Sequence, residues 1–337
     1  MIGSALAFGK VNGRGAAALI KDGALDDVLI DPPEDIPVPG TIYRAIADRP
    51  AKGLGGQFLR LPGGLKGFLR QGQLPAGRHA LVQVTGFAEV GKAIPVTAKL
   101  LFKGRHVIIT PNAKGINVSR QIRDEDRQAA LKDLVVHASP NTTGLILRSA
   151  AEDAKDDLIT EEVLALQGVA DAVLADPGDR AELLLDGPSS QDIAWMDWDH
   201  DGSPVDGFEA FDVEDLIDQM RSPLASVGHA SAYIEPTRAF VAIDVNTGGD
   251  TSPAAGLKAN IAVARDLPRQ LRCRGLGGQI VIDFAPLPKK DRKALENALR
   301  SALRQDDVET ALVGWTPMGL FELNRKRART ALHDILA

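Results

Sequence analysis

Two aspartates stand at the ends of two apolar segments in the last third of the chain. Asp244 ends AFVAID and Asp283 ends QIVID, and Asn246 follows Asp244 by two residues. An extended chain places Asn246 and Asp244 on the same side. Carboxylates that meet at one edge of a sheet repel each other unless a cation lies between them. Oxygen ligands on an exposed rim suit Mg²⁺ or Mn²⁺, which also bind water and substrate phosphate oxygens.

Such a site could polarise a phosphoryl group and activate a water for in-line attack on a phosphodiester. The amide of Asn246 could then bond a non-bridging phosphate oxygen or orient the water. The plainer alternative is that each aspartate caps a turn or the helix that follows it. The residue pattern alone leaves both interpretations open.

The segments around these residues predict a strand, helix, strand crossover. AFVAIDVNTGG and QIVIDF indicate buried strands, and the segment between them indicates a helix that Gly275 ends and Pro268 would kink. A crossover between parallel neighbours is right-handed and brings both carboxyl ends to one edge of the sheet. We therefore expect Asp244 and Asp283 to lie side by side. A helix over RKALENALRSAL, a strand near ETALVGWT and the basic segment RKRAR at 325–329 follow.

The earlier part of the chain predicts a series of short strands. Residues 1–35 alternate apolar runs with turn residues, which favours a hairpin turning near Lys21-Asp22-Gly23. Residues 39–111 continue with glycine-rich turns, a pattern typical of a small barrel. From Asp124 the periodicity becomes helical, then GLILRSA indicates a strand and residues 159–174 a helix.

Composition and charge bound the possible classes of protein. The 337 residues, 44% hydrophobic and 25% charged, are typical of a soluble globular chain of two domains or several modules. A single cysteine, Cys273, excludes an internal disulfide framework and a cysteine-rich zinc site, and it favours the cytoplasm. No apolar run is long enough to span a membrane.

The net charge of −6 at first argues against a nucleic-acid partner. However, residues 187–218 contain ten acids and no Lys or Arg, so the rest of the chain carries +4. The spacing of Asp197, Asp199 and Asp201 resembles a calcium loop, but the twelfth position is Phe208, which favours a solvated acidic turn. An anionic partner is therefore compatible with the sequence.

Three segments, AFVAIDVNTG, NIAVARDLPRQLRCRGLGGQIVIDF and MGLFELNRKR, closely resemble in order and spacing the catalytic core of the ribonuclease E/G family of endoribonucleases. The resemblance implies that Asp244 and Asp283 hold a catalytic Mg²⁺ and that Asn246 helps to position the scissile phosphate. It also implies a mixed α+β multidomain architecture. The implied parts are a ribonuclease-H-like region at 1–38 and 171–218, an S1-like barrel at 39–98, a 5′-sensor region at 99–170 and a DNase-I-like catalytic subdomain at 219–337.

The resemblance also gives two phenylalanines and a lysine a role. Phe58 and Phe68 match the pair with which the family's S1 barrel clamps single-stranded RNA, and Lys92 matches its RNA-contacting lysine. Stacking on an aromatic ring contributes ~1–3 kcal/mol per base with little sequence selectivity. Without the resemblance, an isolated phenylalanine in a small barrel is more often a core residue.

A third set of residues matches the family's 5′-monophosphate pocket. Arg148 and Ser149 fall where the family has Arg followed by Thr, Gly104 and Ile108 match neighbouring positions, and Arg120 is a weaker candidate. A guanidinium pairs bidentately with phosphate, and serine keeps the hydroxyl donor of threonine. The alternative for Arg148 is an ion pair at the end of a strand.

The family's zinc-link, a short cysteine motif after the basic segment, does not occur before the chain ends at Ala337. We therefore expect no zinc and no zinc-linked or disulfide-linked oligomer, while monomer and dimer both stay open. The sequence predicts a Mg²⁺-dependent endoribonuclease of single-stranded RNA, stimulated by a 5′-monophosphate and acting in rRNA or mRNA processing and decay. The alternatives are a non-catalytic RNA-binding protein on the same scaffold and a metal phosphodiesterase that acts on DNA.

Overall fold

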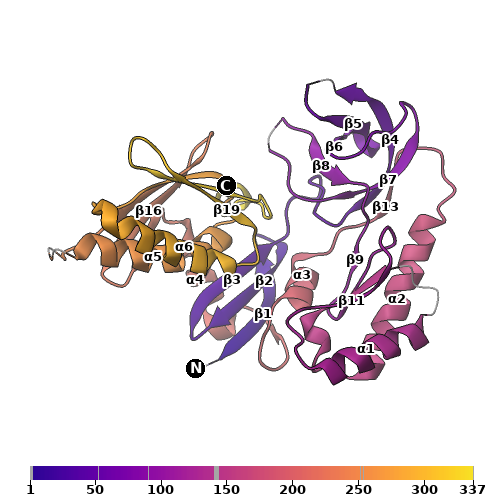
Figure 1. The fold of residues 1–337 in the computed structure, drawn as a ribbon, viewed down its shortest axis with the longest axis horizontal. Helices are drawn as coiled ribbons and strands as arrows, with labels where there is room; N and C mark the ends of the chain where they lie inside the picture. Colours follow the sequence, from indigo (N-terminus) through magenta and orange to yellow (C-terminus); the bar gives the residue numbers. More distant parts are fainter. Residues whose placement is uncertain are drawn as a thin grey trace. The chain divides into compact units, whose positions relative to one another are not determined.

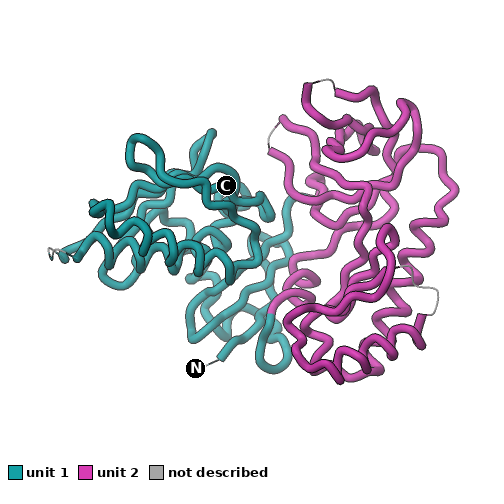
Figure 2. Tube along the Cα trace, in the orientation of Figure 1, with its two compact units in different colours: residues 1–33, 199–337 teal, residues 34–198 magenta. Residues whose placement is uncertain are grey.

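The computed structural model describes residues 3–51, 53–89, 91–139, 144–250, 252 and 254–336. Its chain has a mixed α+β fold in two compact units (Figures 1 and 2). Unit 1 comprises residues 1–33 and 199–337, drawn in teal in Figure 2, and unit 2 comprises residues 34–198. The mixed fold class expected from the sequence is confirmed.

Unit 1 begins with a small sheet in the order β14-β1-β2-β3. Its strands are β1 (Ser4–Val11), β2 (Arg14–Lys21), β3 (Ala24–Ile30) and β14 (Val205–Asp206). The hairpin between β2 and β3 turns through Asp22 and Gly23, both with positive φ, as a two-residue turn matched to the strand twist requires. The predicted hairpin is therefore confirmed. Helix α4 (Val213–Arg221) packs on this sheet through Val213 and Ile217.

The larger sheet of unit 1 has the order β15-β16-β17-β18-β20-β19. Its strands are β15 (Leu224–Val227), β16 (Ala230–Pro236), β17 (Val241–Asn246), β18 (Gly278–Asp283), β19 (Thr310–Trp315) and β20 (Phe321–Arg325). Strands β17 and β18 are parallel, and the other neighbours are antiparallel. Helices α5 (Ala255–Cys273) and α6 (Arg292–Arg304) lie side by side along the sheet (Figure 1).

The core of this subdomain forms between the sheet and the two helices. Alternate residues of the central strands, such as Ile243 and Ile282, share one buried cluster with Leu267 of α5 and Leu299 of α6. Helix α5 is continuous and contains Pro268, which is buried. The predicted crossover is confirmed, and the strand alternation leaves polar side chains on the sheet face away from the helices.

Unit 2 contains a closed barrel and a second α+β layer. Strands β4, β5, β6, β8 and β7 follow one another, and β4 pairs with β7 to close the barrel. The strands are β4 (Ile42–Ala51), β5 (Gly56–Arg60), β6 (Lys66–Leu69), β7 (His79–Val84) and β8 (Ile94–Thr97), with β13 (Glu182–Leu185) added beside β4. The barrel expected from the glycine-rich turns is confirmed.

The second layer of unit 2 is a sheet in the order β11-β12-β10-β9. Its elements are β9 (Phe102–Lys103), β10 (Val107–Ile109), β11 (Gly115–Val118), β12 (Gly144–Leu147), α1 (Glu125–Ala138), α2 (Asp156–Leu174) and α3 (Ser190–Asp197). Asp124 caps α1 by accepting hydrogen bonds from the backbone N–H groups of Asp126 and Arg127, as the acidic start of the helix predicts.

The remaining short elements are 3-10 turns at Pro62–Gly64, Ser149–Ala151, Glu209–Phe211 and Lys289–Asp291, and helix α7 at Leu332–Ile335. Among the residues that the structure describes, no helix has the length and apolar character needed to cross a membrane.

Candidate active site

The two predicted aspartates lie directly opposite each other on neighbouring strands. In the parallel pairing of β17 with β18, Asp244 is in register with Asp283. Ile243 and Val245 on either side of Asp244 are buried, whereas Asp244 and Asp283 are exposed. Strand alternation thus directs both carboxylates to the sheet face that the helices do not cover.

Asn246 completes the predicted group of three. It lies two residues beyond Asp244 on the same strand face, and its Nδ2 donates a 2.9 Å hydrogen bond to Asp244 Oδ2. The bond fixes one carboxylate oxygen and leaves the amide oxygen of Asn246 directed elsewhere. The structure therefore brings all three predicted residues together on one exposed surface.

Tyr233 is a neighbour of this group that the sequence analysis did not identify. It lies opposite Asp244 in the antiparallel pairing of β16 with β17 and is 43% exposed. Directly opposed residues in an antiparallel pair have Cβ atoms ~4.5–5.5 Å apart. Only the strand register relates Tyr233 to Asp244, so nothing in the local sequence indicated that the two residues are neighbours.

Helix α5 holds the backbone that follows Asp283. The side chain of Asn260, which is fully buried, donates from Nδ2 to the carbonyl oxygen of Ala285 at 2.9 Å. Its Oδ1 accepts a 3.0 Å hydrogen bond from the backbone N–H of the same residue. Gly256 permits a close approach, because a Cβ there would lie 2.2 Å from the carbonyl oxygen of Pro286. An asparagine on the apolar face of a predicted helix was the signal that could have revealed this contact.

The donor set at the sheet edge fits a hard divalent cation. Within the described ranges, no group of three or more His, Cys, Asp or Glu side chains is arranged to hold a metal. Asp244 and Asp283 would supply two carboxylates, and water and substrate oxygens would supply the other ligands. This distribution is typical of Mg²⁺ sites, whereas a structural zinc site requires four protein ligands.

The two predicted phenylalanines form one aromatic pair on the outside of the barrel. Phe58 of β5 pairs directly with Phe68 of β6, and their ring centroids are 5.2 Å apart. Their strand neighbours Leu59 and Leu69 are buried in the barrel core, so alternation places the rings outside it. A Cβ on Gly56 would lie 2.5 Å from the Phe68 ring, so glycine is needed there.

Lys92 lies in the exposed turn before β8 of the same barrel. Its ammonium pairs with Glu89 Oε2 at 2.8 Å, and both side chains are exposed. An exposed ion pair contributes only ~0–1 kcal/mol, so Lys92 can exchange this partner for a phosphate at little cost.

Arg148 is held at the carboxyl end of β12 by three acceptors. Nη1 donates to the carbonyl oxygens of Gly104 at 2.6 Å and Met196 at 2.9 Å, and Nη2 pairs with Asp197 Oδ1 at 2.7 Å. Asp197 Oδ2 also accepts from Lys103 at 2.6 Å. The ion pair that was the alternative for Arg148 is thus present, and its partner lies in the acidic window.

The other residues predicted for this pocket lie at the same sheet edge or close to it. Ser149 begins the turn after β12 and is exposed. Exposed Arg120 follows β11, whose parallel pairing with β12 brings both carboxyl ends together. Ile108 of β10 lies opposite Ile146 of β12 and is half-buried.

The half-buried carboxylate of Glu162, on α2, contacts the backbone at this edge. Glu162 Oε1 accepts hydrogen bonds from the backbone N–H groups of His106 and Val107, and Oε2 lies 2.7 Å from His106 Nδ1. Burial acts to raise the pKa of Glu162, but these hydrogen bonds lower the pKa overall. A Cβ on Gly104 would lie 2.0 Å from Glu162 Oε1, so only glycine leaves room for this carboxylate.

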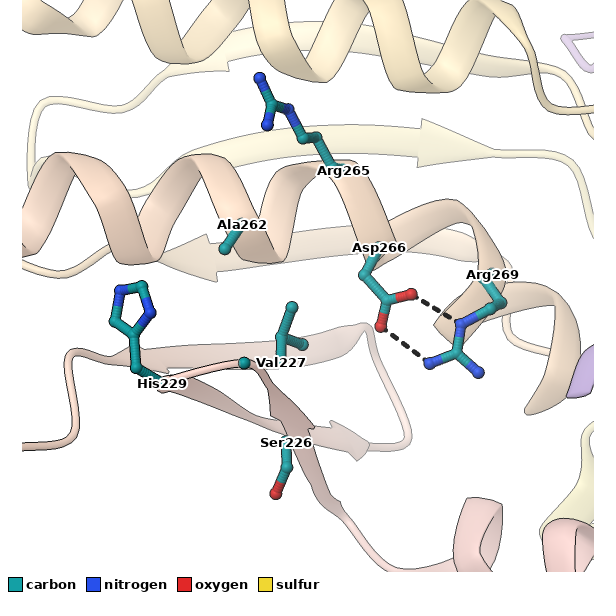
Figure 3. Close-up of a pocket in the computed structure, with 8 residues that line it drawn as sticks. Ser226, Val227, His229, Ala262, Arg265, Asp266 and Arg269 are labelled. Carbon is teal, nitrogen blue, oxygen red and sulfur yellow. Dashed lines mark hydrogen bonds and ion pairs between the residues drawn. The ribbon is translucent and has the colours of Figure 1, made fainter. Parts of the chain in front are cut away.

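A hollow of about 520 Å³ lies apart from the predicted residues, between the β15–β16 turn and α5 (Figure 3). Arg269 pairs there with Asp266 at 2.6 Å, and Arg265 points away from that pair. His229 lines the hollow and is exposed. None of the residues predicted from the sequence lines it.

Comparison with known proteins decides the family. Residues 102–187 and 189–328 match the model of the Ribonuclease E/G family, which is more than half of the chain. The chain belongs to the ribonuclease E/G family. The match includes Asp244, Asn246 and Asp283 as well as Arg148 and its neighbours, whereas Phe58, Phe68 and Lys92 lie outside it.

Curated relatives agree with this family. Ribonuclease E of Synechocystis sp. is 29% identical over 77% of this chain and 45% of its own length. Ribonuclease G of Salmonella typhimurium is 27% identical over 77% of this chain and 62% of its own length. Ribonuclease E of Escherichia coli is 28% identical over 80% of this chain and 29% of its own length. This ribonuclease E/G family chain therefore spans less than two thirds of each of these relatives.

A solved multidomain protein with nucleic acid binding domains from Streptococcus pneumoniae matches 51% of this chain and 60% of its own. Its sequence identity is 16% and its TM-score 0.18, values at which the likeness carries no argument.

Proposed function

We propose that this chain is a Mg²⁺-dependent endoribonuclease that cleaves single-stranded RNA. The observation that supports this most directly is the exposed register of Asp244 with Asp283, with Asn246 bonded to the first carboxylate. The match to the ribonuclease E/G family supports a role for these carboxylates in holding the cation that phosphodiester hydrolysis would use. Mn²⁺ would serve at the same site, and no zinc is expected.

The proposed mechanism assigns a separate task to each residue. Asp244 and Asp283 would hold the cation, which when bound would neutralise their repulsion and polarise the phosphoryl group. Asn246 directs its amide oxygen or Nδ2 toward the attacking water or a phosphate oxygen. Attack of water breaks the bond from phosphorus to the 3′ oxygen, which takes a proton and leaves as a 3′-hydroxyl, while the other fragment keeps a 5′-phosphate.

We assign the architecture in the terms that the sequence suggested. The barrel at 39–98 would be S1-type, residues 1–38 and 171–218 ribonuclease-H-like, residues 99–170 a 5′-sensor region and residues 219–337 DNase-I-like. Closure of the barrel through β4 and β7 supports the first assignment, and the helix-covered sheet with paired carboxylates supports the last.

The barrel would supply the grip on RNA. Phe58 and Phe68 present an aromatic pair outside the core, on which bases can stack irrespective of their identity. Lys92 would exchange Glu89 for a backbone phosphate. The proposed substrate is therefore unpaired RNA in rRNA or mRNA processing and decay, and the proposed location is the cytoplasm.

Arg148 would bind the 5′-monophosphate of the substrate, with Ser149, Gly104, Ile108 and the weaker candidate Arg120 around it. In the structure, Asp197 forms a 2.7 Å ion pair with the Arg148 guanidinium, at the group that would bind the phosphate. Arg148→Ala should remove the preference for 5′-monophosphate over 5′-hydroxyl RNA. An unchanged cleavage ratio between the two RNAs would rule out this sensor.

Two other functions compete with this proposal. A non-catalytic RNA-binding protein has no use for paired rim carboxylates that repel phosphate, so Asp244 and Asp283 argue against it. A phosphodiesterase acting on DNA would use the same carboxylates, but the half-buried phenylalanine pair outside the barrel core favours a flexible single strand.

The decisive experiment uses one short labelled RNA with either 5′ end, single-stranded or in a duplex, incubated with Mg²⁺ or with chelator. We expect cleavage of the single strand in Mg²⁺ alone, faster with the 5′-monophosphate. RNA binding without cleavage in Mg²⁺ and in Mn²⁺ would favour the binding protein. Equal cleavage of DNA of the same sequence would favour the DNA phosphodiesterase.

A further inference from the structure

An exposed tryptophan lies next to the proposed phosphate pocket. Trp195 of α3 is 44% exposed, whereas Trp198, three residues later, is 5% exposed and belongs to the core. The guanidinium of Arg105 lies over the Trp195 ring, with Cζ 4.8 Å from the ring centroid. Arg105 Nη1 also donates a hydrogen bond to the carbonyl oxygen of Trp195. The indole is thus fixed in place while a large part of its surface faces solvent.

This aromatic stack is continuous with the contacts of Arg148. Arg105 directly follows Gly104, whose carbonyl oxygen accepts from Arg148 at 2.6 Å. On the other side, Met196 directly follows Trp195, and its carbonyl oxygen accepts from Arg148 at 2.9 Å. Gly104, next to Arg105, and Met196, next to Trp195, therefore both connect the stack to the guanidinium that would bind the phosphate.

The charge of this corner favours an anion. Lys103, Arg105 and Arg148 bring three positive charges. Asp197 pairs with Lys103 and Arg148, and the carboxylate of Glu162 lies beside Gly104, so the cations still outnumber the carboxylates. A bound phosphate can replace Asp197 as the partner of Arg148 because both present oxygen acceptors of suitable geometry. The exposed indole beside these cations offers a flat surface for a nucleobase, since base stacking on an aromatic ring contributes ~1–3 kcal/mol.

We propose that Trp195 and Arg105 form a subsite for the base of the 5′-terminal nucleotide. The inference rests on the proposed 5′-phosphate sensing and extends it from the phosphate to the whole terminal nucleotide. In this subsite the base stacks on the indole of Trp195, and Arg148 binds the phosphate. Arg105 keeps the indole in position through its stacking contact with the ring and its hydrogen bond to the Trp195 carbonyl oxygen. Because every base has an aromatic face, the subsite accepts any base but discriminates against an end that lacks one.

The test separates the base from the phosphate by using four versions of one short RNA. The first nucleotide carries either a 5′-monophosphate or a 5′-hydroxyl, and it is either intact or abasic. Binding is measured by fluorescence anisotropy in chelator, so that no cleavage occurs. For the wild-type protein, removal of the first base should weaken binding of the 5′-monophosphate RNA at least about fivefold, corresponding to the lower end of the stacking range.

Variants then locate the effect. In Trp195→Ala the intact and abasic RNAs should bind alike, Trp195→Phe should keep most of the difference, and Arg105→Gln should reduce it. Leu183→Ala is the control, because Leu183 is an exposed apolar residue of the same unit and lies on β13, away from this stack. Circular dichroism checks that each variant is folded. If Trp195→Ala does not fold, Arg105→Gln and Trp195→Phe still test the subsite.

The outcomes distinguish the two proposals. A phosphate effect without a base effect overturns the base subsite and leaves phosphate sensing intact. A base effect of the same size in wild type and in Trp195→Ala also overturns the subsite. If neither the phosphate nor the base alters binding, both proposals are wrong. A base effect that Trp195→Ala abolishes and Trp195→Phe retains supports the subsite.

Discussion

Replacing Asn260 with alanine should loosen the loop that follows Asp283. The Asn260 side chain makes two hydrogen bonds to the backbone of Ala285, at 2.9 and 3.0 Å, in a fully buried position. Alanine leaves a buried N–H and a buried C=O without these partners. Each unsatisfied group costs ~1–3 kcal/mol, so we expect the two groups to lower the free energy of unfolding by about 2–6 kcal/mol. A domain in the upper part of the ~5–15 kcal/mol range of stability stays folded after this loss.

The same substitution should impair cleavage more than RNA binding. Asp283 lies two residues before Ala285, and a displacement of ~1 Å at a reacting centre can cost ~100-fold in rate. We therefore expect kcat to fall about 10- to 100-fold while the Kd for RNA in chelator changes less than about twofold. Urea unfolding gives the stability, and single-turnover cleavage gives the rate.

The matched control is Asn297→Ala, which removes the same side chain from an exposed position of α6. A surface substitution of this kind changes stability by ~0.5 kcal/mol or less. The reasoning is refuted if Asn260→Ala loses no more stability than Asn297→Ala and cleaves at the wild-type rate. In that case the loop after Asp283 does not depend on α5.

Three further predictions follow from the environments of single side chains. In the folded protein the pKa of Glu162 is lowered from its ordinary value of 4.5. The ionised Glu162 side chain therefore stabilises the fold above pH 4.5, and this stabilisation is lost as the pH falls through the lowered pKa of the folded state. The stability deficit of Glu162→Gln should therefore shrink as the pH falls below 4.5, and a deficit independent of pH in urea unfolding would contradict this. Phe58→Ala and Phe68→Ala should each weaken binding of single-stranded RNA by ~1–3 kcal/mol without unfolding the barrel. Tyrosine at either position should keep most of the affinity. Anisotropy titrations measure both effects. Burial, and to a smaller extent the charge of Asp27, raise the pKa of the Cys273 thiol to about 12. A thiol reagent at pH 8 should therefore modify Cys273 only when urea unfolds the protein. Rapid labelling of the native chain would contradict this, because it would show that the core around Cys273 opens.

The sequence predicted the elements that carry the catalytic group. The two apolar segments that end in Asp244 and Asp283, with a helix between them, were enough to predict parallel strands and a shared edge. The direct register of Asp244 with Asp283 depends on the length of the crossover and on packing of α5, so periodicity alone did not supply it. Tyr233 became a neighbour of the group only through that register.

The surroundings of Arg148 were less predictable for a related reason. Its partners Gly104 and Asp197 are 44 and 49 residues away along the chain, and nothing in the local sequence pairs them. The acidic window was predicted as a solvated turn, although its first half contributes the carboxylate that neutralises Arg148 and Lys103. Composition describes such a window, whereas only the tertiary contacts assign a partner to each of its charges.

The central claim is that Asp244 and Asp283 together hold the cation on which RNA hydrolysis depends. The most direct measurement is the rate of single-stranded RNA cleavage by Asp244→Asn, by Asp283→Asn and by the double variant across a Mg²⁺ titration, with RNA affinity measured in chelator. Asp215→Asn, an exposed acid on α4 of the same unit, controls for the loss of one negative charge. We expect each active-site variant to lose cleavage while it binds RNA as well as the wild type, and Asp215→Asn to cleave normally. Substantial Mg²⁺-dependent cleavage by the double variant would contradict the claim.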